Sequence, residues 1–451
     1  MLMPNPKKIT LFIGDILVLY FSLWLTLLIR YWPNFDLSRF SQHFWPFTII
    51  YFVWLIIFYI AGLYALDLAR NNLGFYSTFL KALTLNAALA VAFFYFIPFF
   101  GIAPKTNLFL NLLILIILIS GWRHFYNYFL KSEIFLNNIL IIGQTKETQQ
   151  MIDWLKTHPQ LGYRLTQEMK PNDIQTPFDL LETASQKNIK IIITAIDPHQ
   201  NTHLAESLYQ CLPLKISFSD FPNFYERIMG KVPLSSIGEI WFLENLTESQ
   251  KNFYEAAKRI FDMLGAFVFG LISLIFYPLI ALIIKIDSRG PLFIKQKRVE
   301  QDGQPFVLYK FRTMYATAKD GSSEPGGRPV YAQINDPRNT RVGKFFRKTR
   351  LDELPQLWNI FLGQMSFIGP RAERVEFVEE LGKKIPYYQI RHIVKPGLTG
   401  WAQVNFRYGA SVEDSIEKLQ YELYYIKHRS FILDLSIALR TISIILKGVG
   451  Q

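Results

Sequence analysis

The sequence has 451 residues, enough for two to four domains, and its content of 50% hydrophobic and 16% aromatic residues indicates a membrane protein rather than a soluble one. The net charge of +12 suits anionic lipids or phosphorylated substrates, and because no stretch interleaves basic and aromatic residues as nucleic-acid modules do, we expect no nucleic-acid partner. The single cysteine, Cys211, excludes an intramolecular disulfide and any multi-cysteine metal site.

Residues 1–131 contain four apolar runs, at about 9–29, 44–64, 79–100 and 107–122. Each is close to the length that a helix needs to cross roughly 30 Å of hydrocarbon, so we predict a four-helix transmembrane bundle. Lysine and arginine residues are more frequent on the side of the N-terminus, which places both ends of the bundle in the cytoplasm. Asp15 and Asn111 lie inside the runs, and we assign a structural role to both.

Residues 137–222 change character, because short apolar strands such as NNILIIG alternate with amphipathic helices. This alternation predicts a small, doubly wound, Rossmann-like domain. The turn after the first strand has only Gly143 of the three glycines in a dinucleotide-binding loop, so we expect no NAD binding and a regulatory or structural role. His199 and His203 have helical spacing, but a zinc site needs more ligands than this pair offers.

After a connection at 223–250, an apolar run at 260–286 is long enough to span a membrane. A full crossing would carry the basic segment 287–451 out of the cytoplasm, against the positive-inside tendency. A hairpin that bends at Pro278 would keep that segment inside, since proline removes a helical hydrogen bond and kinks the helix. We therefore predict a re-entrant helix broken at Pro278, and a straight span is the alternative.

The next stretch, KQKRVEQDGQPFVLYKFRTM, predicts two strands around a turn. Lys310 and Arg312 alternate with apolar residues and project from one side, either as phosphate clamps or as solvated edge charges. Residues 316–335 are polar and rich in glycine and proline, and we expect a loop that closes over substrate. Residues 372–395 predict an amphipathic helix, and the apolar stripes near the C-terminus belong either to the core or to a membrane interface.

The stretch 341–371 surrounds one adjacent pair of carboxylates, Asp352 and Glu353, with basic side chains. Apolar spacing predicts a short helix from about Asp352 to Gly363, so the helix dipole and the neighbouring cations would favour the ionised acid that a nucleophile or metal ligand requires. The alternative is that Asp352 caps the helix and Glu353 pairs with a surface lysine. The cations are Arg338, Arg341, Lys344, Arg347, Lys348, Arg350 and Arg371.

Three fragments in this order make the pattern specific. They are KRIFDMLGAFVFGLISLIFYPLIALIIKIDSRGPLFIKQKRVEQDGQPFVLYKFRTM, DPRNTRVGKFFRKTRLDELPQLWNIFLGQMSFIGPR and KPGLTGWAQVNFR. Over roughly residues 256–446 the sequence resembles the bacterial polyprenyl-phosphate sugar-1-phosphate transferases. The resemblance implies an α/β catalytic domain at 251–451 that carries the re-entrant helix, with a membrane bundle and a Rossmann-like domain ahead of it.

The resemblance also implies the chemistry. Asp352 would attack the sugar-bearing phosphate of a UDP-sugar, release UMP and form an aspartyl-phosphosugar, which the phosphate of a polyprenyl lipid would then attack. Glu353 would hold Mg²⁺ or Mn²⁺ on the pyrophosphate, because hard oxygen ligands suit these ions. The phosphates would be bound by Arg347, Lys310, Arg312 and Arg371.

The implied partners are a UDP-sugar, polyprenyl phosphate and membrane lipids, and symmetry base rates favour a homodimer. The implied location is the bacterial inner membrane, with the catalytic domain on the cytoplasmic face, where the protein would begin the assembly of a polysaccharide. Two alternatives stay open, namely a catalytically silent membrane scaffold and an ordinary glycosyltransferase that releases UDP.

Overall fold

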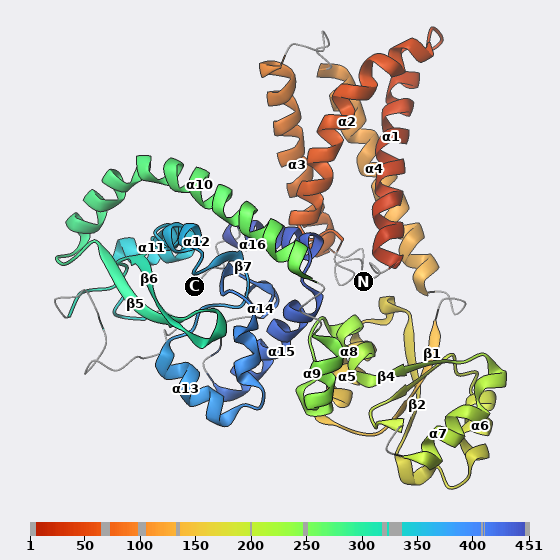
Figure 1. Cartoon of the computed structure of the whole chain (residues 1–451). Helices are drawn as coiled ribbons and strands as arrows, with labels where there is room; N and C mark the ends of the chain where they lie inside the picture. The colour runs from red at the N-terminus through yellow and green to blue at the C-terminus, as the bar shows by residue number, and fades with distance from the viewer. Residues whose placement is uncertain are drawn as a thin grey trace. The chain divides into compact units, whose positions relative to one another are not determined.

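The computed structural model of the protein describes residues 6–64, 73–97, 105–131, 136–198, 201–246, 251–317, 323, 336–406, 409 and 411–446. The chain divides into two units, Met1–Phe224 and Tyr225–Gln451. Figure 1 shows the elements of each unit, coloured from the N-terminus to the C-terminus.

The first unit begins with four long helices, α1 (Pro6–Arg30), α2 (Leu37–Ile60), α3 (Leu73–Phe96) and α4 (Lys105–Lys131). All four are long and apolar enough to cross a membrane, so the prediction of four apolar helices is confirmed. The helix α4 continues well past residue 122, where the apolar run ends in the sequence.

Buried polar contacts join these helices to one another. Arg123 on α4 forms an ion pair with Asp15 on α1 at 2.6 Å and also donates to the Leu63 carbonyl at 3.0 Å. Asn111 accepts a hydrogen bond from Tyr51 and donates one to Ser22. Asp15 and Asn111 therefore both have partners inside the bundle, which agrees with the structural role expected for them.

An α/β part follows, in which four parallel strands lie in the order β2-β1-β3-β4 and helices connect consecutive strands. The four residues Ile139–Ile142 of β1 are all fully buried, as expected for a parallel strand covered on both faces. The strands are β1 (Asn137–Ile142), β2 (Tyr163–Met169), β3 (Ile191–Thr194) and β4 (Ser217–Asp220). The helices are α5 (Lys146–Thr157), η3 (Pro159–Leu161), η4 (Pro171–Asp173), α6 (Pro177–Gln186), α7 (Thr202–Gln210), η6 (Leu212–Leu214) and α8 (Phe221–Met229).

The turn after β1 is tight. Gly143 has φ +99°, and a Cβ atom there would lie 3.1 Å from Ile196, so this position suits only glycine. His199, one of the two histidines with helical spacing, lies outside the described residues.

The second unit is an α/β body with two small sheets. Its strands are β5 (Phe293–Val299) and β6 (Pro305–Phe311), which pair antiparallel as predicted, and β7 (Ser366–Ile368) and β8 (Gly397–Thr399), which pair in parallel. Its helices are η7 (Leu234–Ser236), α9 (Glu239–Asn245), α10 (Asn252–Asp287), η9 (Gln301–Gly303), α11 (Arg341–Thr349), η11 (Leu351–Glu353), α12 (Gln356–Leu362), α13 (Val375–Lys384), η12 (Tyr388–Ile393), α14 (Trp401–Asn405), α15 (Val412–His428) and α16 (Phe431–Leu446).

Two glycine-containing loops next to β7 and β8 lie backbone to backbone. The Gly397 amide donates to the Pro370 carbonyl at 2.7 Å, and the Gly369 amide donates to the Thr399 carbonyl at 2.9 Å. A Cβ atom on Gly397 would collide with the backbone nitrogen of Gly369. This close approach fixes the backbone on both sides of Pro370, immediately before Arg371.

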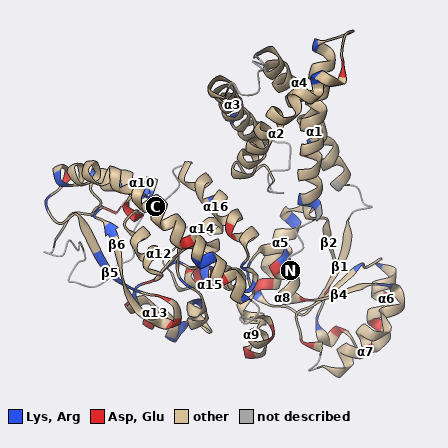
Figure 2. Cartoon of the chain, turned by 45° about the horizontal axis from the view of Figure 1, so that its top comes forward, with Lys and Arg blue, Asp and Glu red and all other residues tan. Residues whose placement is uncertain are grey.

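The 36-residue helix α10 runs unbroken through Pro278, so the predicted break at this residue is wrong. The helix lies along one side of the second unit (Figure 1). Its buried residues share one face at helical spacing: Asp262, Ala266, Ser273, Ile280 and Ile284. Its opposite face exposes large apolar side chains, including Phe267, Val268, Leu271, Ile272, Ile275 and Leu279. Between Asp262 and Lys285 the helix has no charged residue, and this stretch is tan in Figure 2.

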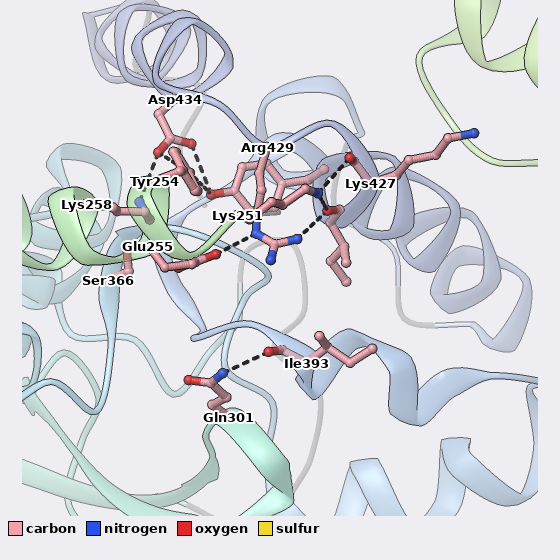
Figure 3. A network of polar contacts seen from close by, with 12 residues as sticks. Lys251, Tyr254, Glu255, Lys258, Gln301, Ser366, Ile393, Lys427, Arg429 and Asp434 are labelled. Atoms are coloured by element: carbon pink, nitrogen blue, oxygen red, sulfur yellow. Dashed lines mark hydrogen bonds and ion pairs between the residues drawn. The ribbon is translucent and has the colours of Figure 1, made fainter. Parts of the chain in front are cut away.

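Both ends of α10 are attached to the same body. Towards its N-terminus, Arg259 donates to the carbonyls of Ile360 and Phe361, both at 2.7 Å, at the C-terminal end of α12. Towards its C-terminus, Ile280 and Ile284 pack in a core cluster with Phe311 of β6 and Phe346 of α11. Figure 3 shows further polar contacts of the first turns of α10 with the junction of α15 and α16, where Lys258 and Tyr254 both bind Asp434.

Candidate active site

The two adjacent acids lie in a short connection between α11 and α12. Arg350 ends α11 in the left-handed conformation, with φ 59°, and a single 3-10 turn, η11, then carries Asp352 and Glu353. The α-helix starts only at Gln356, after Pro355, so the prediction that it begins near Asp352 is wrong by about one turn. Its predicted end is confirmed, since Gly363 closes α12 with φ 88°.

Glu353 is buried and binds three cations through one oxygen. Its Oε1 atom lies 3.1 Å from Arg371, 3.3 Å from Arg350 and 3.4 Å from Lys310. Burial alone would raise the pKa of Glu353, but these three cations outweigh burial and hold the pKa well below its ordinary value. Glu353 is therefore ionised across the physiological pH range.

Asp352 is also buried, and its Oδ1 atom has no hydrogen-bond partner among the described residues. Burial, together with the negative charge of Glu353, raises the pKa of Asp352 to about 6, although Lys310, Arg350 and Arg347 oppose this shift. This corrects the expectation that its surroundings favour the ionised form. Glu353 therefore binds three cations through its Oε1 atom, whereas the Oδ1 atom of the neighbouring Asp352 has no hydrogen-bond partner among the described residues.

The structure brings Lys310 and Arg371 to this pair of acids. Burial lowers the pKa of Lys310 to about 8, with the charge of Glu353 opposing the shift. Arg347 donates to Asn339 at 2.8 Å, and its charge is among those that act on Asp352. Arg312 lies elsewhere, because it donates to Ser288, Arg289 and Pro291 and holds the loop after α10.

Three further residues at the site received no role from the sequence. Arg350 is one of the cations of the 341–371 stretch, and the structure adds its contact with Glu353 at 3.3 Å. Arg298 on β5 donates to the Ala372 carbonyl at 3.0 Å. Asn359 on α12 donates to the Val307 carbonyl at 2.7 Å and accepts from the Tyr309 amide, which ties α12 to β6. A polar residue on the apolar face of a predicted helix is the signal by which Asn359 could have been found.

The fit of a divalent ion depends on Glu353. Among the described residues, no group of three or more histidine, cysteine or acidic side chains could hold a metal ion. Glu353 offers one carboxylate, whose Oε1 already binds three cations. The described residues therefore offer no metal cage made of protein ligands, and an ion such as Mg²⁺ would have to be bound mainly by substrate phosphates.

The expected loop at 316–335 lies mostly outside the described residues, which include only Ala316, Thr317 and Ser323 of it.

Comparisons with known proteins concern both units. The family model described as "Bacterial sugar transferase" matches residues 253–448. The chain is 39% identical over 246 residues to a UDP-N-acetylgalactosamine-undecaprenyl-phosphate N-acetylgalactosaminephosphotransferase of Aeromonas hydrophila, a match that covers 54% of this chain and 55% of the relative. It is 35% identical over 344 residues to a UDP-galactose-lipid carrier transferase of Erwinia amylovora, covering 71% of this chain and 70% of the relative.

A third relative, a UDP-glucose:undecaprenyl-phosphate glucose-1-phosphate transferase of Escherichia coli (strain K12), is 28% identical over 340 residues. This match covers 72% of this chain and 69% of the relative. The chain thus spans about half of the Aeromonas protein and about two thirds of the other two.

Proposed function

The chain belongs to the bacterial sugar transferase family, and from this premise we propose that it transfers a hexose-1-phosphate from a UDP-sugar to polyprenyl (undecaprenyl) phosphate and releases UMP. The product would be the first lipid-linked intermediate of exopolysaccharide, capsule or O-antigen assembly. The observation that carries the proposal is the buried Asp352 with an unpartnered oxygen beside Glu353 and its cations.

The reaction takes place in two displacements on one phosphorus atom. Asp352 Oδ1 attacks the phosphorus that bears the sugar, and the bond from this phosphorus to the bridging oxygen breaks, so that UMP leaves with the electron pair. A phosphate oxygen of the lipid then attacks the same phosphorus and releases the Asp352 carboxylate. The unpartnered Oδ1 atom supports this role, because it can approach the phosphorus atom without first giving up a hydrogen bond.

The cations reduce the repulsion between the two reacting anions. Lys310, Arg350 and Arg371 lie within 3.4 Å of Glu353, so they are held beside Asp352 before the substrate arrives. Arg347 adds its charge, whereas Arg312 only fixes the 288–291 loop. A bound Mg²⁺ or Mn²⁺, held by Glu353 and the substrate pyrophosphate, would neutralise charge on the phosphate oxygens.

For membrane association, we propose that α10 is re-entrant. Ala266 and Ile280 both pack into the second unit, and the helix between them is about 21 Å long at 1.5 Å per residue, shorter than roughly 30 Å of hydrocarbon. A helix that crossed the bilayer could not keep both ends on one soluble body. The exposed apolar face of α10 would enter one leaflet, with Pro278 at the curve.

A labelling experiment tests this topology. Single cysteines replace Glu244 before α10, Gln304 after it, or Asn34 between α1 and α2, in a Cys211→Ser background, and intact cells are treated with a membrane-impermeant maleimide. We expect labelling only at position 34, since the re-entrant helix keeps Glu244 and Gln304 together in the cytoplasm. Labelling at 304 with protection at 244 would establish a straight span instead.

The remaining assignments belong to the same proposal. The parallel sheet of the first unit is Rossmann-like, binds no NAD because two of the three fingerprint glycines are missing, and is regulatory or structural. The protein works as a homodimer in the bacterial inner membrane, with its second unit on the cytoplasmic face, where nucleotide sugars are found.

The released nucleotide tests the proposed function directly. Membranes containing the chain are incubated with UDP-glucose, UDP-galactose or UDP-N-acetylgalactosamine, with and without polyprenyl phosphate, and UMP and UDP are quantified. We expect one sugar nucleotide to give about one UMP per site without lipid, and turnover with lipid, as ping-pong kinetics require. Release of UDP would indicate an ordinary glycosyltransferase, and no nucleotide release with any sugar would favour a scaffold.

A further inference from the structure

Arg391, on η12, is buried and does not contact the acid pair. Its guanidinium binds Glu422 of α15 through two bonds, from Nε to Oε2 at 2.9 Å and from a terminal nitrogen to Oε1 at 2.7 Å. The other terminal nitrogen donates to the Tyr388 hydroxyl at 2.8 Å. Both partners of the ion pair are about 4% exposed, so this is a fixed, two-pronged contact inside the second unit.

One more bond of Arg391 leads towards the active site. The same nitrogen that binds Glu422 Oε1 also donates to the backbone carbonyl of Arg371 at 3.0 Å. The side chain of Arg371 in turn donates to Glu353 at 3.1 Å. A continuous series of contacts therefore connects Glu422, Arg391, Arg371 and Glu353.

The backbone around Arg371 is held from several directions. Gly397 donates to the Pro370 carbonyl at 2.7 Å, Arg298 donates to the Ala372 carbonyl at 3.0 Å, and Arg391 holds the carbonyl between them. Each contact comes from a different part of the second unit. Three successive carbonyls are thus fixed, and the direction in which the Arg371 side chain leaves the backbone is fixed with them.

On the basis of the proposed function, we infer that Arg391, oriented by Glu422, is a positioning residue for sugar-phosphate transfer. It holds the Arg371 carbonyl so that the Arg371 guanidinium lies at Glu353 and beside Asp352. A buried ion pair is weak evidence for stability, because desolvation offsets much of the Coulombic gain. A misplacement of about 1 Å at a catalytic centre, in contrast, costs about 100-fold in rate.

The test uses two conservative substitutions and a control on the same helix as Glu422. Arg391→Lys keeps the buried charge but loses the planar fork that reaches Glu422 and Arg371 together. Glu422→Gln keeps the size and weakens the orientation of Arg391. The control is Glu417→Gln. Glu417 lies on α15, like Glu422, and its substitution removes a 2.7 Å ion pair with Lys231 that has no part in the contacts around Arg371.

We expect Arg391→Lys and Glu422→Gln to lower kcat by about 10- to 100-fold, with KM for the UDP-sugar changed less than about threefold. Glu417→Gln should stay within about twofold of the parent chain. The deciding readout is a double-mutant cycle, because a residue that acts only through Arg371 causes no further loss in an Arg371→Ala background.

Losses that add fully in the Arg371→Ala background, or parental kcat in both folded variants, would overturn the inference. If Arg391→Lys does not give a cooperative melting transition, Glu422→Gln alone carries the cycle. The parent chain separates this result from the proposed function: no UMP release from the parent refutes the proposed function, whereas the inference fails only when the parent is active and the cycle is additive.

Discussion

Replacing Asp352 with asparagine is expected to lower sugar-phosphate transfer by at least about 1,000-fold while the chain stays folded. Asparagine has nearly the same shape, so the packing around this buried position is kept. Its amide oxygen is a far weaker nucleophile than a carboxylate, and the substitution removes the buried carboxylate whose oxygen lies unpartnered beside the cations of Glu353. UMP release without lipid is the measurement, because it isolates the first displacement.

Asp434 offers a control of similar burial. It is 8% exposed against 7% for Asp352, and it binds Lys258 and Tyr254 at the start of α10, far along the chain from the acid pair. Asp434→Asn should keep transfer within about threefold of the parent, since asparagine still accepts these hydrogen bonds. Near-parental UMP release by a folded Asp352→Asn chain would remove Asp352 as the nucleophile.

Replacing Glu353 with glutamine is expected to lower transfer by about 100-fold and to move its pH dependence. In the parent chain, burial and the charge of Glu353 raise the pKa of Asp352 to about 6. The first displacement needs ionised Asp352, so its rate falls as the pH drops below about 6. Burial still raises the pKa of Asp352 in this variant, but without the charge of Glu353 the cations Lys310 and Arg350 lower it more effectively. The pKa of Asp352 therefore falls, and the loss of rate in acid moves to lower pH.

The measurement is the rate of the UMP burst between about pH 4.5 and 8, without lipid, so that ionisation of the lipid phosphate plays no part. The parent chain and Glu353→Gln are compared by the pH at which each rate falls to half of its maximum, so the comparison does not depend on the absolute rates. An acid limb that stays in place, or that moves to higher pH in Glu353→Gln, would mean that Asp352 is not the titrating group.

Patterns that extend over many residues could be predicted from the sequence. The four apolar runs became α1–α4, and the Asp302-Gly303 turn joins β5 to β6 as expected, since length and alternation are local properties of the chain. The start of α12 was placed too early, because apolar spacing outweighed a local signal. Pro355 favours the entry into a helix, so Gln356 and not Asp352 was the better starting point.

Which charged side chains reach the site, and how they are ionised, depends on contacts that the spacing of residues in the sequence does not show. Lys310 and Arg312 are two residues apart, which predicts one shared side of a strand. The strand β6 ends at Phe311, so the alternation stops there and Arg312 turns to the loop after α10. The raised pKa of Asp352 likewise depends on burial, and the sequence alone shows only that cations lie nearby.

One contact of α10 has a mechanical consequence. Arg259, near the start of this helix, binds the last carbonyls of α12, and the acid pair lies just before the first turn of α12. The helix α12 has seven residues, so it is a stiff rod of about 10 Å between Arg259 and the carboxylates. Because α12 joins Arg259 to the acid pair, the contact made by Arg259 couples the position of α10 to the position of Asp352.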